Sequence, residues 1–281
     1  MVTAAIPAWN PHPDVWILIA LIAAGYAIAA VRLGPRLAPD PAHPVTRLQY
    51  TALVVALLGI WVASDWPMHD VSERSMYSVH MVQHLMFTTL GAPLLLIATP
   101  GWLARWILSP AWLLRTLRTL SRFLPGVLIA GFMVSFSHWP AFVQLSIQNG
   151  LVHFVAHVML VVTSLIVWMP LLSPLPEVPR LSIPLRCGYL FVQSFIPTLP
   201  ATFLTYGDSP LYRIYERFPK LWGLSALEDQ QIAGLIMKTA GGLILWLIIT
   251  VLFFRWAGEE ERQQRMQSKA RRPIPNVEFT Q

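Results

Sequence analysis

The segment GLVHFVAHVMLVVTSLIVWMPLL, residues 150–172, contains no charged residue over 23 positions. As a helix it would be about 35 Å long, enough to cross the hydrocarbon core of a bilayer. Composition extends this argument to the whole chain, because 55% of the residues are hydrophobic and 12% are charged, against roughly 25% charged residues in soluble domains. The sequence therefore predicts an all-α, polytopic membrane protein.

Seven apolar segments of roughly 20 residues each are candidate transmembrane helices. We expect them at residues 15–33, 48–66, 77–99, 125–146, 150–172, 187–205 and 231–254. Residues 1–256 would then form a seven-helix transmembrane domain, and residues 257–281 a charged cytoplasmic tail. The polar segment 206–230 predicts a folded cap on the outer side. Residues 101–123, in which Trp and Leu alternate with Arg, predict an amphipathic piece in the membrane interface.

The basic residues are divided unequally between the two sides of this arrangement. With the N-terminus outside, the cytoplasmic segments carry 15 of the 20 Lys and Arg, the outer segments carry four, and Lys238 lies within the last span. Cytoplasmic segments are enriched in Lys and Arg, so we predict an N-out, C-in orientation. The first 14 residues contain no Lys or Arg, which predicts no cleavable signal peptide. The single cysteine, Cys187, excludes a disulfide framework and a CxxC motif.

Two histidine pairs with the spacing HxxxH lie inside predicted spans. His80 and His84 are one helical turn apart in MYSVHMVQHLMFTT, residues 76–89, and His153 and His157 repeat the spacing in the segment quoted first. In the predicted orientation the pairs lie at matching depths, with the inner member of each on the order of 10 Å below the outer surface. Intramembrane ionisable groups are costly and usually functional. The four imidazoles therefore predict a metal site.

The residues around the pairs narrow the choice of metal. The positions between the histidines read MVQ and FVA, so neither pair contains the carboxylate of a zinc hydrolase motif. Imidazole with nearby thioether suits copper, and zinc is the alternative. Four weaker ligand candidates are expected in the same leaflet: Asp229, His138, Met76 and Met237. The outer-loop sequence DWPMHD, residues 65–70, is a candidate capture site through its Met, His and Asp.

Four stretches together resemble the CtaG-type assembly factors of caa3-type cytochrome c oxidases. They are HMVQHLMFTTLGAPLLLIATP, LVHFVAHVMLVVTSLIVWMPLL, LEDQQIAGLIMKTAGGLILW and FFRWAGEEER. The resemblance covers the second to seventh predicted spans. It implies a multi-pass protein of the bacterial inner membrane that helps deliver copper to an oxidase, with an oxidase subunit and a periplasmic copper donor as partners. The family's paired histidines match His80, His84, His153 and His157, and its acidic start of the last helix matches Asp229.

The resemblance favours a metallochaperone or assembly factor over an enzyme. The strongest enzyme alternative is a zinc-dependent membrane hydrolase that uses the same histidines, with Asp229 as the base. A b-type cytochrome would need the histidines of each helix about four turns apart. A retinal protein would need an intramembrane carboxylate as the counter-ion of Lys238, and the span interiors contain none.

Overall fold

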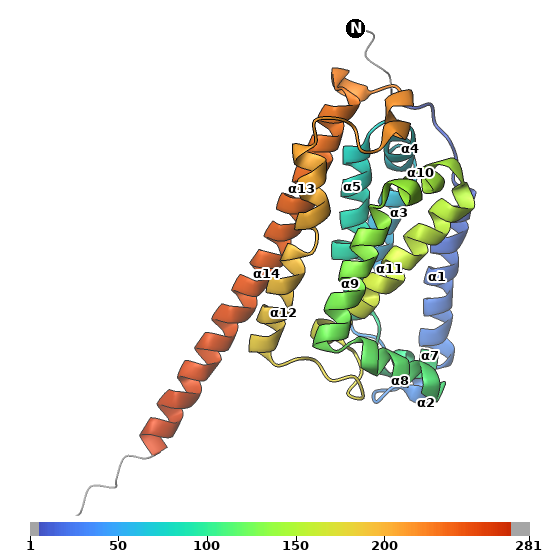
Figure 1. Cartoon of the computed structure of the whole chain (residues 1–281). Helices are drawn as coiled ribbons and strands as arrows, with labels where there is room; N and C mark the ends of the chain where they lie inside the picture. The colour runs from blue at the N-terminus through green and yellow to red at the C-terminus, as the bar shows by residue number, and fades with distance from the viewer. Residues whose placement is uncertain (1–5, 271–281) are drawn as a thin grey trace, which may run out of the picture.

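The computed structural model describes residues 6–270, and this part of the chain is all-helical, without a strand. Six helices or helix series are long and apolar enough to cross a membrane, or seven if the bent pair α8–α9 counts as one crossing. In Figure 1, α1 stands at one side of the bundle, α12, α13 and α14 at the other, and α5, α9 and α11 between them.

The elements run in this order: α1 Pro13–Arg32, α2 Gly34–Leu37, α3 Arg47–Ser64, α4 Met68–Arg74, α5 Tyr77–Leu85, the π-helical turn η1 Met86–Gly91, α6 Ala92–Ala98, α7 Gly101–Ile107, α8 Ala111–Leu120 and α9 Phe123–Ser137. They continue with α10 Pro140–Gln148, α11 Gly150–Leu172, α12 Ile183–Phe195, α13 Thr198–Tyr206, the short 3-10 helices η2 Arg213–Arg217 and η3 Leu221–Gly223, and α14 Ala226–Ala270.

The third predicted span is one continuous helical segment made of α5, η1 and α6. Its irregular middle has a covalent cause, because Pro93 has no amide hydrogen and so cannot donate to the carbonyl of Thr89 one turn earlier. The chain widens into a π turn just before the proline. The neighbouring carbonyl, that of Thr88, instead accepts a hydrogen bond from the indole Nε1 of Trp168 at 2.8 Å. This bond ties the segment to α11.

The fourth predicted span, 125–146, is wrong at its outer end. Helix α9 ends at Ser137 and α10 begins at Pro140. Proline disfavours helical backbone in the residue before it, and Trp139 is extended, with φ −70° and ψ 127°. At 15 residues, α9 is about 22 Å long, short of a full crossing. At its other end it meets the amphipathic helix α8 at 85°.

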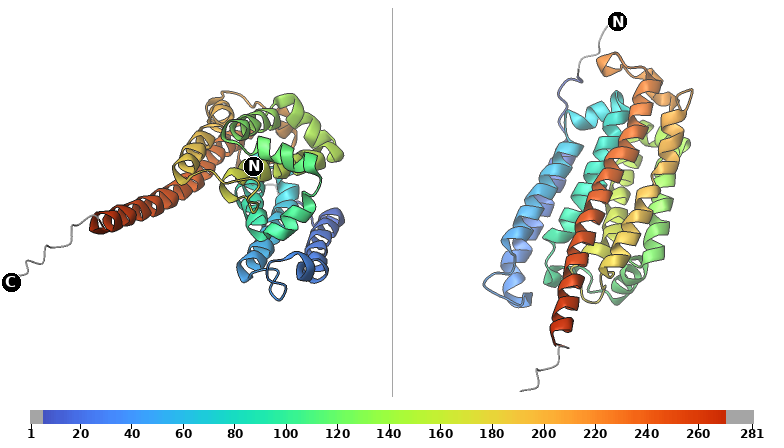
Figure 2. Two further views of the ribbon diagram at one scale, coloured as in Figure 1. Left: turned by 90° about the horizontal axis from the view of Figure 1, so that it is seen from below. Right: turned by 90° about the vertical axis from the view of Figure 1, so that its left-hand side faces the viewer.

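The last helix is longer than predicted. We expected the span to end near residue 254 and the tail to start at 257, but α14 continues as one helix of 45 residues to Ala270. Its charged end has helix-forming Glu, Arg and Gln residues and no proline or glycine after Gly258 up to that point. Figure 2 shows this end projecting beyond the bundle. The rest of the predicted tail, 271–281, lies outside the described residues.

The segment between α13 and α14, residues 207–225, folds over one end of the bundle. The hydroxyl of Tyr212 donates to the carbonyl of His138 at 2.8 Å, and the hydroxyl of Tyr215 donates to the carbonyl of Ser72 at 3.0 Å. These bonds join the cap to the end of α9 and to α4. The prediction of a folded cap is therefore confirmed, and the cap lies at the end of the bundle where both histidine pairs begin.

Candidate metal centre

Four imidazoles from α5 and α11 meet between the two helices. Within each helix the rings lie one turn apart, and the centroid distance is 4.2 Å for His80–His84 and again 4.2 Å for His153–His157. Across the helices it is 6.0 Å for His80–His153 and 5.7 Å for His84–His157. The two pairs therefore meet, as their matching depths along the spans predicted.

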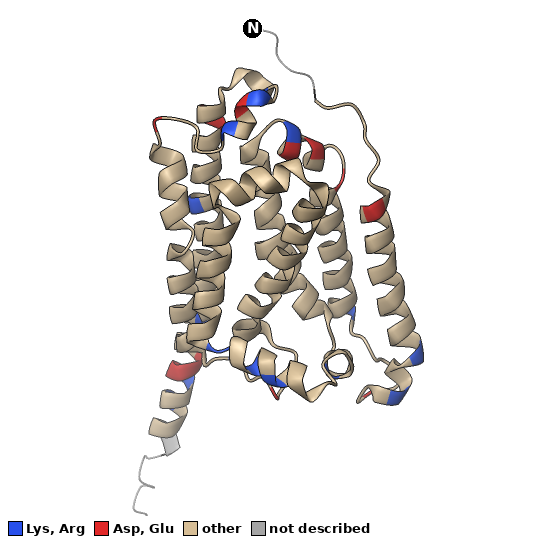
Figure 3. Cartoon of the chain, turned by 45° about the vertical axis from the view of Figure 1, so that its right-hand side comes forward, with Lys and Arg blue, Asp and Glu red and all other residues tan. Residues whose placement is uncertain are grey.

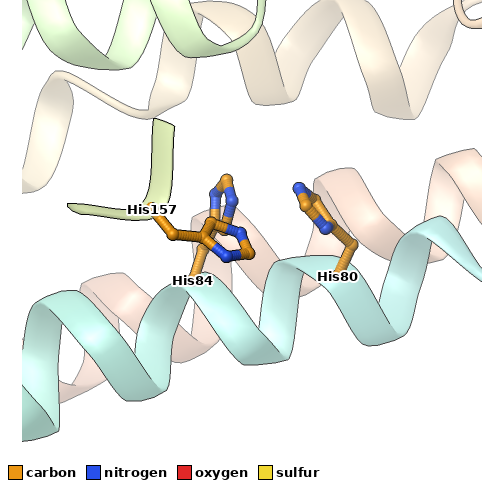
Figure 4. Close-up of side chains that lie close together, drawn as sticks. All are labelled: His80, His84 and His157. Atoms are coloured by element: carbon orange, nitrogen blue, oxygen red, sulfur yellow. The ribbon is translucent and has the colours of Figure 1, made fainter. Parts of the chain in front are cut away.

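Three of these imidazoles, those of His80, His84 and His157, form a compact group that we call the inner triad. One ring nitrogen from each lies within 4.8 Å of the others (Figure 4). The buried atoms His80 Nδ1 and His157 Nε2 have no hydrogen-bond partner among the described residues. The three rings border a cavity of about 20 Å³, close to the space that a single water molecule needs.

The inner triad fits a metal ion better than it fits an internal polar network. Buried polar groups are normally hydrogen-bonded, and each group left without a partner costs roughly 1–3 kcal/mol. A metal ion bound at about 2 Å by the free nitrogens would remove this cost. An all-imidazole ligand set suits copper or zinc.

The fourth imidazole, that of His153, belongs to a different group. Its Nε2 lies 2.9 Å from Glu73 Oε1, and the same oxygen is 3.5 Å from His69 Nε2. Ligand atoms of these three residues also lie within 4.8 Å of one another, and we call this group the outer triad. His69 and Glu73 are one turn apart on α4, which packs on α5 and so presents both side chains to α11.

The electrostatics of α4 favour the forms of these side chains that bind metal. Burial lowers the pKa of His69 below its ordinary value, although the carboxylate of Glu73 acts to raise it. This shift favours the neutral imidazole. Burial acts to raise the pKa of Glu73, but the adjacent His153 and His69 outweigh burial and hold the pKa below its ordinary value. The outer triad thus pairs an ionised carboxylate with a neutral imidazole.

Seven of the eight histidines form one continuous series through the half of the bundle next to the cap. Besides the two pairs, His12 lies 4.8 Å from His69 and His69 lies 5.5 Å from His153, as ring-centroid distances. At the other end His138 lies 6.3 Å from His84. The eighth, His43, is exposed and lies beside Asp40.

Two of the weaker candidates border the inner triad from the side of α14. His138 Nδ1 lies 2.8 Å from the carbonyl oxygen of Val134, and its Nε2 is buried without a partner among the described residues. His138 and Met237 line a cavity of about 130 Å³ together with His84 and Met81. His138 belongs to neither triad. Met237 borders the same cavity as His84.

Met76 lies farther from the metal centre. Its side chain is fully buried and packs in one hydrophobic cluster with Val71 and Leu221, away from the imidazoles. Its place one turn before His80 put it on the expected face of the helix, but α5 begins only at Tyr77. Met76 therefore serves as a packing residue between α4 and the outer cap.

Asp229 lies at the N-terminus of α5 and outside both triads. Its Oδ2 accepts a hydrogen bond from the N–H of Tyr77 at 2.6 Å, and its Oδ1 accepts from the N–H and the hydroxyl of Ser78 at 3.0 and 2.6 Å. Lys220 Nζ is 3.5 Å from Oδ2, whereas Lys238 is exposed on α14. Free N–H groups and the helix dipole favour a carboxylate at this position. Asp229 therefore caps α5 and joins it to α14.

Glu73 is the site residue that the sequence argument missed. His69 was expected to act with its neighbours in residues 65–70. Asp70 instead accepts from Asn10 at 3.1 Å and contacts His12 Nε2 at 2.8 Å, which ties down the N-terminal segment. The signal for Glu73 was its spacing, because HDVSE places it four residues after His69 and so on the same helical face.

Comparison with known proteins gives one match. The model of the family described as cytochrome c oxidase caa3 assembly factor (Caa3_CtaG) matches residues 19–259. The matched region includes both triads and all the helices from α3 to α13. No curated protein and no solved structure matches the chain.

Proposed function

We propose that this chain, which belongs to the family of caa3-type cytochrome c oxidase assembly factors, binds copper as cargo and supports maturation of the oxidase. The observation that carries the copper proposal is the inner triad. It holds three imidazoles whose nitrogens converge, two of them buried without a partner among the described residues, around a space for one ion. Ligands without thiolate suit a carrier that must also release its cargo.

The charge distribution supports delivery from the periplasmic side. Figure 3 shows most of the Lys and Arg positions at the end of the bundle opposite the outer cap, and a few at the cap end. By the positive-inside rule that end faces the cytoplasm, so the histidine series lies in the periplasmic half of a bacterial inner membrane. An ion arriving there meets no competing cytoplasmic thiol. Its source would be a periplasmic copper donor, and its destination an oxidase subunit.

The zinc hydrolase alternative loses the base that we predicted for it. All of the hydrogen bonds and the ion pair of Asp229 serve the N-terminus of α5 and the outer cap. A hydrolase would need another carboxylate beside the imidazoles, and in the described residues that is Glu73. The inner triad itself contains no group that could take a proton from bound water other than its own imidazoles.

The test is copper content of protein purified in mild detergent. Replacing His84 and His157 together by Ala should remove about one copper ion per chain, because a site with one remaining ligand does not hold the ion. His43→Ala is the matched control, since it removes an imidazole that lies apart from the series, and it should keep the wild-type copper content. Gel filtration and thermal unfolding show that each variant is folded.

The cellular test uses the same variants. A strain with the double variant should show low oxidase activity that excess copper in the medium partly restores, and the His43→Ala strain should be normal. Normal oxidase activity in a strain that lacks His80, His84, His153 and His157, with expression confirmed, would exclude this role and favour a zinc hydrolase.

A further inference from the structure

We propose that the outer triad is a second cation site, which takes up a divalent transition-metal ion from the outer side and passes it to the inner triad. Its ligands are His69, Glu73 and His153. The destination of the ion rests on the proposed function, but the existence of the second site does not.

The ligand set is that of a transition-metal site. Two imidazoles and one carboxylate come from two elements, α4 and α11, with Glu73 Oε1 at 2.9 and 3.5 Å from the imidazole Nε2 atoms. Nε2 of His153 and Oε1 of Glu73 lie 2.9 Å apart, so one ion can reach both atoms. Two imidazoles with a carboxylate suit Zn²⁺ and Cu²⁺. The carboxylate also offsets part of the charge of a divalent ion, which the neutral inner triad cannot do.

A hydroxyl behind His153 allows the tautomer that metal binding requires. Metal bound at Nε2 places the ring proton on Nδ1. For His153 that proton faces Ser146 Oγ at 3.2 Å, which can accept it. Ligating histidines commonly use such hydrogen bonds to fix the ring.

One cavity connects the two triads. A space of about 510 Å³ between α1, α3 and α11 is lined by all three residues of the outer triad and by His157 of the inner triad. Its remaining walls are mostly apolar, and Asp14 adds a carboxylate at its rim. Because His153 and His157 are one turn apart, with ring centroids 4.2 Å apart, an ion moves between the sites by exchanging ligands over one helical turn.

Position along the helices sets the order of the two sites. The side chains of His69 and Glu73 are 16% and 23% exposed on α4, at the end of the bundle next to the cap. His157 of the inner triad lies one turn farther along α11 from that end than His153 does. An ion that enters at the cap end therefore meets the carboxylate first and reaches the all-imidazole group second.

The experiment is equilibrium dialysis of the full chain in detergent against Zn²⁺ and, separately, Cu²⁺, with bound metal measured by mass spectrometry. Wild type should bind about two ions per chain, and Glu73→Gln about one, because the amide keeps the volume of the carboxylate but not its charge. The remaining ion at the inner triad shows that the variant is folded. Glu216→Gln is the control, since Glu216 is an exposed acid on the outer cap, and it should bind as wild type does.

A time course of Zn²⁺ uptake tests the transfer step. Glu73→Gln should fill the inner triad at least about tenfold more slowly than wild type, since the ion loses its first carboxylate ligand. A wild-type chain that binds one ion, or a Glu73→Gln chain that binds two, overturns the second site. Equal uptake rates overturn its role in transfer. If instead the His84 and His157 double variant keeps both ions, the proposed function fails while the outer triad stands.

Discussion

Replacing Asp229 by Ala tests whether its carboxylate stabilises the fold or binds a metal ion. The side chain is fully buried and accepts three hydrogen bonds at the start of α5, two of them from backbone N–H groups. The variant would leave these N–H groups and the ammonium of Lys220 without their carboxylate. Breaking a buried ion pair on one side costs about 3–5 kcal/mol, and each orphaned donor costs roughly 1–3 kcal/mol before relaxation.

We expect a loss of about 3–5 kcal/mol in the free energy of unfolding, with water entering to satisfy the donors. On the scale of domains of 150–250 residues this lowers Tm by roughly 6–20 °C. The assay is thermal unfolding in detergent, followed by the reaction of a thiol dye with Cys187, the single cysteine. The control is Asp208→Asn, because Asp208 is exposed in the same outer cap and forms no hydrogen bond with the described residues.

Metal content measured on the same samples completes this test. Folded Asp229→Ala should bind as much copper or zinc per chain as wild type does at low temperature, because its carboxylate lies outside both triads. An unchanged Tm together with lost metal would refute the assignment of Asp229 as a helix cap and make it a ligand. Lys220→Met should lower Tm for the same reason, since it leaves the carboxylate without its counter-charge.

Three further predictions follow from the fold. Gly234→Ala should cost about 1–3 kcal/mol of stability by overpacking, since a Cβ there would lie 2.5 Å from Thr205 Oγ1 on α13; unchanged thermal unfolding would argue against this close helix contact. Burial acts to raise the pKa of Asp65, but two indole N–H groups and a backbone N–H lower it overall. The stability that the Asp65 carboxylate contributes should be complete above the ordinary carboxyl range and lost as pH falls through the folded pKa. Asp65→Asn, compared with wild type at neutral and acidic pH, should abolish this pH-dependent part of the stability. Reporter fusions at residue 110 should report a cytoplasmic location and those at residue 215 an external one, and the opposite pattern would reverse the orientation.

The grouping of the imidazoles was predictable from sequence to the extent that helical spacing determines it. The HxxxH spacing places His80 beside His84 and His153 beside His157 in any α-helix. Their common depth follows from where the apolar segments begin. His69 and Glu73 have the same i, i+4 spacing. From sequence alone, however, Glu73 cannot be told apart from an ordinary solvated carboxylate in a short loop helix, because its neighbours from other helices are unknown.

Two weaker candidates, Met76 and Asp229, have other neighbours than expected, because local spacing does not say what a side chain faces. Met76 stands one turn before His80, yet it precedes the first residue of α5 and packs against the outer cap. Asp229 starts the last helix as expected, but its carboxylate serves the N-terminus of a different helix. The partners in both cases come from segments about 150 residues away along the chain.

The sequence alone determined the all-helical membrane architecture, because long uncharged segments and their proline boundaries follow from local chemistry. Only the tertiary structure decided how the histidines are grouped. His153 lies beside Glu73 rather than in the inner triad because α4 packs on α5 and presents its carboxylate to α11. That arrangement depends on the packing of three helices against one another. It is the sum of many weak contacts between distant segments, which no local pattern encodes.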